Sequence, residues 1–184
     1  MIKLGFLARE LVGILTSVGL VLGVAAITLW VLNGVPTQIQ GTNKVLEFKD
    51  TRDAQLALGI KISRPAYFPD YLAWPPALIQ AQKRPAIAVL MTFTSREQDR
   101  EVLWIHEVIG QVDKVFVTQL PEPKKALQRS KIDLNGDEAE LVLGQGLDGE
   151  AYNYIRWKHS NRYIAMATVY SQEELLKMAR SMTY

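Results

Sequence analysis

The sequence has 184 residues, of which 48% are hydrophobic and 22% charged, a composition typical of ordered proteins. Lysine and arginine number 21 and aspartate and glutamate 19, so the net charge is only +2. Such a chain has little attraction to phosphate backbones, and we expect it to bind no nucleic acid. The absence of cysteine excludes disulfides, thiolate metal ligands and cysteine nucleophiles.

The first long apolar segment predicts a membrane anchor. Residues 11–32 read LVGILTSVGLVLGVAAITLWVL and include no charged side chain. A helix that rises about 1.5 Å per residue would span roughly 30 Å here, the thickness of the hydrocarbon core. A cleaved signal peptide is the alternative, but the apolar run continues through residues 27–32, past the usual length of its apolar region.

Flanking charges predict the orientation of this anchor. Lys3 and Arg9 precede it, whereas residues 33–43 are uncharged, and cytoplasmic flanks are enriched in basic residues. We therefore expect a single-pass protein of the cell membrane, with its C-terminal domain outside the cytoplasm. The expected parts are a cytoplasmic tail (1–10), a transmembrane helix (11–32), a linker (33–49) and an extracytoplasmic domain (50–184).

Small residues form a stripe along the predicted transmembrane helix. Gly19 and Gly23 have the GxxxG spacing, which lets helix backbones approach closely, and Thr16 and Ala26 extend the same face. This face predicts contact with a membrane-protein partner as well as with membrane lipid. Ordinary use of glycine in transmembrane helices is the alternative.

The remaining residues, about 135, suit one domain. A short helix follows Asp50 and stops at Gly59, and a proline-rich extended connection leads on from it. Seven segments have the apolar or alternating pattern of strands. They are Ala86–Thr94, Glu101–Ile109, Val112–Gln119, Ser130–Leu134, Glu138–Leu143, Ala151–Trp157 and Arg162–Val169.

Turn and capping signals connect these segments. Hairpins are expected at Gly110-Gln111 and, through the strong Asn135-Gly136 signal, between the fourth and fifth strands. Ser171 and Glu174 have the spacing of a capping box at the start of an amphipathic C-terminal helix. The predicted class is α+β, with a mostly antiparallel, curved sheet and this helix packed on it.

A GxGxxG pattern at Gly144, Gly146 and Gly149 raises the question of dinucleotide binding. That fingerprint needs a helix after the glycines, whose N-terminus meets the pyrophosphate. The following residues, AYNYIRW, alternate as a strand does. We therefore expect a glycine-rich loop between antiparallel strands and no nucleotide site.

The proline-rich connection carries four aromatic residues, Tyr67, Phe68, Tyr71 and Trp74. Aromatic side chains bury a large area at low entropic cost, so this segment is a candidate contact surface. A lid that simply covers the core is the alternative.

Residues that could support catalysis are few. His106 and Glu107 are neighbours on a predicted strand and should face opposite sides of the sheet, while His159 is expected in an exposed, cationic corner with Lys158 and Arg162. No nucleophile-elbow, zinc-protease or phosphate-loop motif occurs. The sequence predicts no catalytic residue, no metal site and no cofactor, and hence no enzyme.

Two stretches resemble a bacterial domain of unknown function that occurs in the extracytoplasmic part of anchored, anti-sigma-factor-like proteins. They are DAQLALGIKISRPAYFPDYL (53–72) and YIRWKHSNRYIAMATVYSQEELLKMARSM (154–182). The family is distantly similar to lipoprotein-carrier and sigma-regulator sensor domains. The resemblance implies a periplasmic, helix-covered antiparallel sheet. Only about ten residues precede the anchor here, which argues against the cytoplasmic sigma-binding domain of such proteins.

These observations favour a membrane-anchored, non-catalytic binding or assembly module, such as an accessory subunit of a membrane complex. A carrier or sensor of lipid or lipoprotein that uses a concave sheet face is the second hypothesis. An enzyme with an unrecognised site is the third. An open apolar cavity between sheet and helices would favour the carrier, and a filled core would count against it.

Overall fold

The computed structural model describes residues 45–110, 112, 120, 123–146 and 149–184. No helix within these ranges is long and apolar enough to cross a membrane. The predicted anchor (11–32) and its small-residue face lie outside the described residues, as do the tail and most of the linker.

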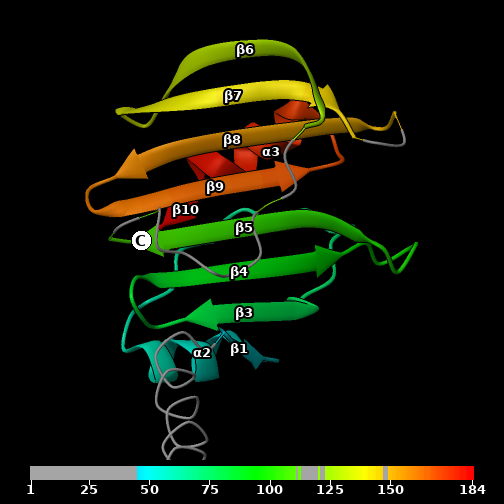
Figure 1. Ribbon diagram of the computed structural model, residues 1–184. Helices are drawn as coiled ribbons and strands as arrows, with labels where there is room; N and C mark the ends of the chain where they lie inside the picture. The colour runs from blue at the N-terminus through cyan, green and yellow to red at the C-terminus, as the bar shows by residue number, and fades with distance from the viewer. Residues whose placement is uncertain (1–44, 111, 113–119, 121–122, 147–148) are drawn as a thin grey trace, which may run out of the picture. The chain divides into compact units, whose positions relative to one another are not determined.

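An antiparallel sheet dominates the described part of the chain. It has the strand order β1-β3-β4-β5-β9-β8-β7-β6 (Figure 1), and β10 pairs separately with β2. Its strands are β1 (Val45–Phe48), β3 (Leu78–Gln82), β4 (Ile87–Thr94), β5 (Glu101–Ile109), β6 (Lys125–Leu134), β7 (Asp137–Gln145), β8 (Ala151–His159) and β9 (Arg162–Thr168). The other elements are α2 (Thr51–Leu58), β2 (Arg64–Pro65), α3 (Gln172–Arg180) and β10 (Met182–Thr183). This arrangement confirms the α+β class.

The main core lies between one face of the sheet and the two helices. Figure 1 shows α3 and β10 behind the sheet. Strand side chains that alternate toward this face are buried together with those of the helices, because burial of apolar surface is the main stabilising contribution. Fully buried members include Met91, Phe93, Ile105, Leu141, Ile155, Met166, Leu175 and Met178.

The helix boundaries follow the sequence signals. The side chain of Asp50 accepts a hydrogen bond from the amide of Arg52 at the start of α2, and Gly59 ends that helix with φ of 73°. The side chain of Ser171 accepts from the amide of Glu174 at the start of α3. Both helix predictions are therefore confirmed.

The opposite face of the sheet has a smaller apolar cluster of its own. Leu90, Val142 and Tyr152 are buried there, and Leu120 packs against them. His106 lies on this face and Glu107 on the core face, as the strand alternation predicts. Burial lowers the pKa of His106 to about 4, because a charged imidazole is poorly solvated there.

The turn predicted at Asn135-Gly136 is confirmed, and the predicted glycine-rich loop is confirmed for Gly146 and Gly149 but not for Gly144. Asn135 and Gly136 have φ of 58° and 95°, as the turn between β6 and β7 requires. Gly146 and Gly149 lie between the antiparallel strands β7 and β8, and no helix follows them. Gly144 belongs to β7, where an added Cβ would come within 2.6 Å of the Pro123 side chain, so close packing explains that glycine.

Two expectations need correction. Val45–Phe48, expected in the linker, forms the edge strand β1, with Phe48 packed against the core. The hairpin at Gly110-Gln111 is wrong, because β4 and β9 already occupy both edges of β5. Residues 113–119 of its predicted second strand lie outside the described residues.

One strand was not expected, and another begins well before its predicted start. β3 was not predicted, because Gln80 and Gln82 interrupt its apolar pattern, yet Ile79 and Ala81 are fully buried. β6 begins at Lys125, five residues before the predicted start at Ser130. Pairing with neighbouring strands, which one local pattern does not reveal, stabilises both segments.

Candidate binding site

The proline-rich connection, which carries the four aromatic residues, joins α2 to β3 on the core side of the sheet. Main-chain contacts hold it at both ends. At its start, β2 pairs with β10 through Arg64 and Thr183. At its end, the amide of Arg96 donates to the carbonyl of Tyr71 at 2.9 Å, and the amide of Ala73 donates to the carbonyl of Thr94 at 2.9 Å. The segment is therefore fixed against the body of the domain.

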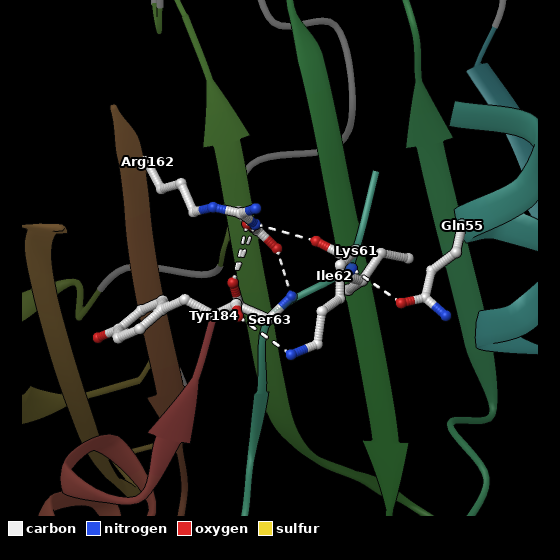
Figure 2. Close-up of polar contacts among 7 residues, drawn as sticks. Gln55, Lys61, Ile62, Ser63, Arg162 and Tyr184 are labelled. Carbon is white, nitrogen blue, oxygen red and sulfur yellow. Dashed lines mark hydrogen bonds and ion pairs between the residues drawn. The ribbon is translucent and has the colours of Figure 1, made fainter. Parts of the chain in front are cut away.

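A buried carboxylate anchors the residues that lead into this segment. Glu107 is 1% exposed and accepts hydrogen bonds from the Ser63 amide (2.8 Å) and the Ser63 hydroxyl (2.9 Å) (Figure 2). It also forms an ion pair with Arg162, which donates in turn to the carbonyl of Lys61 at 3.0 Å. We call Glu107, Ser63 and Arg162 the Glu107 cluster. A buried charge needs such partners, so the cluster ties the connection to β5 and β9.

Two further contacts in Figure 2 hold the same stretch. The amide of Ile62 donates to the side-chain oxygen of Gln55 in α2 at 3.0 Å. The Lys61 ammonium donates to the main-chain oxygen of Tyr184 at 3.1 Å. The backbone immediately before Arg64 is thus connected to α2, the sheet and the residue that follows β10.

The four aromatic residues were predicted to form either a contact surface or a lid over the core, and the structure divides them into two pairs. Phe68 and Tyr71 are partly buried and pack against the core. Trp74 is 47% exposed and Tyr67 is 39% exposed. One pair therefore covers the core, and the other presents aromatic surface to solvent.

Ring contacts fix Trp74 in spite of its exposure. Its ring lies 6.0 Å from that of Phe93 in a stacked arrangement and 5.6 Å from that of Phe68 in an edge-to-face one. Phe68 in turn contacts Phe93, with ring centroids 5.0 Å apart. Such contacts stabilise aromatic pairs beyond simple burial, so the indole is held in place with nearly half of its surface in solvent.

The two tyrosines differ in their hydroxyl groups. The Tyr67 hydroxyl donates to the Glu174 carboxylate at 2.8 Å, and this hydrogen bond raises the pKa of Tyr67. Tyr71 packs against Tyr170 with ring centroids 4.2 Å apart, and burial raises the pKa of Tyr71. Its hydroxyl has no hydrogen-bond partner among the residues that the structure describes. Tyr67 thus links the segment to α3, and Tyr71 fills space.

A groove of about 420 Å³ lies along this segment, and we call it the aromatic groove. Its apolar lining comes from Pro65, Phe68 and Trp74, and its charged lining from Arg64, Asp70 and Arg96. Arg96 donates from Nε to the carbonyl of Leu72 at 2.9 Å. Within the described residues, neither Arg64 nor Arg96 forms an ion pair.

A second hollow, of about 450 Å³ over β6, β7 and β8, has a different arrangement of charges. Glu140 pairs there with Arg129 (3.0 Å) and Arg156 (2.5 Å), and Lys131 pairs with Glu138 (2.9 Å). Hydrogen bonds from Arg156 and Arg129 lower the pKa of Glu140. Because charges of both signs alternate and neutralise each other, we interpret this hollow as a solvated face of the sheet.

The expected cationic corner around His159 is wrong in its composition. Arg162 is engaged with Glu107, and His159 Nδ1 lies 2.7 Å from a carboxylate oxygen of Asp137. The imidazole also stacks on the Tyr184 ring with centroids 3.9 Å apart. The sequence around His159 does not indicate these contacts, because Asp137 belongs to β7 and Tyr184 follows β10.

The described ranges contain no group of three histidine, aspartate or glutamate side chains placed to hold a metal ion. No family model, curated protein or solved structure matches this chain. The resemblance of residues 53–72 and 154–182 to an extracytoplasmic bacterial domain therefore stays a prediction.

Proposed function

We propose that this chain is a single-pass membrane protein whose extracytoplasmic domain is a non-catalytic binding module, an accessory subunit of a larger membrane complex. The observation that carries the proposal is the aromatic groove. It combines a half-exposed tryptophan with two arginines and an aspartate on a segment that is held at both ends. The predicted anchor (11–32) supplies the membrane location.

The energetics of the groove support binding. An exposed aromatic ring gives up water-contacting area when a partner covers it, and it loses little conformational entropy because it is already held. Trp74 is exposed to solvent, and its contacts with Phe93 and Phe68 already hold its ring in place. Tryptophan and arginine are also enriched among the residues that dominate binding energy at interfaces.

The filled core favours this proposal over a lipid or lipoprotein carrier. Leu141, Ile155, Leu175 and Met178 are fully buried between the sheet and α3. An acyl chain would have to displace these side chains, because the chain itself occupies the space where a carrier would need a cavity.

The state of the buried carboxylate favours binding over catalysis. Glu107 is fully engaged with Ser63 and Arg162, so its oxygens are not available to a substrate. His106 faces the opposite side of the sheet and cannot act together with Glu107.

Two measurements test the proposal. An alkaline carbonate wash should leave the full chain in the membrane pellet, and release of the intact chain into the supernatant would contradict the anchor. Native mass analysis after mild detergent extraction from the source membranes should then find the chain in a complex that the Trp74→Ala variant weakens. A strictly solitary monomer would contradict the binding module. Leu56→Ala is the matched control, since Leu56 is exposed and does not line the groove.

A further inference from the structure

We propose that the occupant of the aromatic groove is an extended peptide segment of a protein partner, in which an apolar or proline residue stands beside an acidic one. The proposal rests on the proposed function and specifies the chemistry of its partner. It depends on three features of the groove: its charges, its aromatic wall and its concave shape.

The charges of the groove call for a carboxylate. Arg64 and Arg96 are exposed and form no ion pair within the described ranges. The backbone at Arg64 is fixed, because its carbonyl accepts from the Thr183 hydroxyl at 3.0 Å. The Arg96 guanidinium is tethered through Nε to the carbonyl of Leu72. A guanidinium held as in Arg96 is well suited to charge-assisted hydrogen bonds with a carboxylate, and Arg64 adds a second positive charge to the lining of the groove.

The aromatic wall calls for an apolar residue on an extended backbone. Phe68 and Trp74 meet at an interplanar angle of 83°, so their rings form two walls of a corner. Extended and proline-containing peptides bind aromatic-lined grooves of this kind, because their backbone is already ordered before binding. Pro65 adds further rigid apolar lining.

The shape and the remaining charge favour a peptide over a membrane surface. A bilayer engages protruding aromatic residues, whereas here the tryptophan lines a hollow of about 420 Å³. Asp70 also lines the groove, so the charges of the lining are mixed in sign, whereas an anionic headgroup surface presents one sign only. A peptide can match both kinds of charge in the groove. Its carboxylate would lie near the arginines, and its backbone amides or a basic residue would lie near Asp70.

The test uses the full chain in phosphatidylcholine nanodiscs and three fluorescein-labelled peptides, GSPLPEEGS, GSPLPQQGS and GSPLPKKGS. Fluorescence anisotropy should show the acidic peptide binding at least ten-fold more tightly than the lysine peptide, with the glutamine peptide between them. Added salt should reduce the preference, since the contacts are exposed. Equal binding of the three peptides, or no binding of any, would overturn the proposal.

Variants locate the contact. Replacing both groove arginines (Arg64→Gln with Arg96→Gln) should weaken the acidic peptide at least three-fold and leave the glutamine peptide unchanged, whereas Trp74→Ala should weaken both. Arg52→Gln is the matched control, because Arg52 is exposed on α2 and does not line the groove. An arginine effect no larger than that of the control would overturn the proposal.

A further arm addresses the membrane alternative. In nanodiscs that contain brominated phosphatidylglycerol, the difference in emission between the full chain and Trp74→Phe should show no quenching. Strong quenching would place the indole in lipid and overturn the peptide assignment. If the peptide preference fails while the native complex is still weakened by Trp74→Ala, the partner chemistry is wrong and the proposed binding function stands.

Discussion

The Glu107 cluster and the aromatic groove meet at consecutive residues of the chain, Ser63 and Arg64, but they differ in burial and in the pairing of their charges. Ser63, in the cluster, is fully buried, and the next residue, Arg64, is an exposed member of the groove. In the cluster each charge has its partner within the chain, whereas in the groove the arginines have no such partner among the described residues. The comparison indicates how one short segment both holds the fold together and presents a binding surface.

Breaking the cluster should have the largest effect on stability. Glu107→Ala leaves the partly buried Arg162 without its counter-ion and removes both acceptors from Ser63, so we expect a loss of about 3–5 kcal/mol in the free energy of unfolding. Urea unfolding of the full chain in detergent micelles, followed by circular dichroism, measures this. Glu173→Ala, at an exposed carboxylate of α3, is the control. A loss below about 1 kcal/mol would show that the cluster is not a structural anchor.

The buried His106 extends the comparison to an ionisable group that is kept neutral. Its pKa is about 4 in the folded chain, against about 6.5 when unfolded. The unfolded chain therefore binds the proton more readily. The contribution to stability is complete above pH 6.5 and falls as the pH decreases toward 4, by about 3 kcal/mol. His106→Leu should abolish this part of the pH dependence in unfolding experiments at pH 7 and pH 4.5. An unchanged pH profile would contradict the burial of a neutral imidazole.

The cap of α3 should also affect stability, because α3 supports one side of the groove segment through Glu174 and Tyr67. Ser171→Ala removes the side-chain acceptor for the Glu174 amide and should cost about 1 kcal/mol. The midpoint of thermal unfolding reports this loss. Ser171→Asp retains an acceptor and should restore the stability, and a failure to do so would contradict the capping role.

Replacing Trp74 should change stability much less than breaking the cluster does. The residue is 47% exposed, so Trp74→Ala should lower the free energy of unfolding by about 1–2 kcal/mol while it removes the partner contact. Urea unfolding is again the measurement. Global unfolding of this variant would show that the tryptophan is a structural lid and would end the distinction between the two regions.

Elements with strong local signals could be predicted from the sequence. The Asn135-Gly136 turn, the capping box at Ser171 and the apolar strand at Glu101–Ile109 each depend on residues close together in the chain, and all three occur as predicted. β1 and β3 were missed, because their short patterns become strands only through pairing with each other and with β4.

The candidate site shows the same limit. The four aromatic residues could be selected from their composition, but which of them reach solvent depends on Phe93 and Tyr170, which lie elsewhere in the chain. Glu107 in an apolar strand was a signal that a partner must exist, since a buried carboxylate needs one. Arg162 is 55 residues away from it, and the pairing requires the register of β5 against β9.

Photo-crosslinking at position 74 tests the central claim most directly. Benzoylphenylalanine placed at Trp74 of the full chain, in source membranes, should form one discrete adduct with another polypeptide. Mass spectrometry of this adduct also identifies the contacted segment. The same probe at Leu56 should not form that adduct. Adducts with lipid alone, or identical adducts at both positions, would contradict the assignment of the aromatic groove as the binding surface.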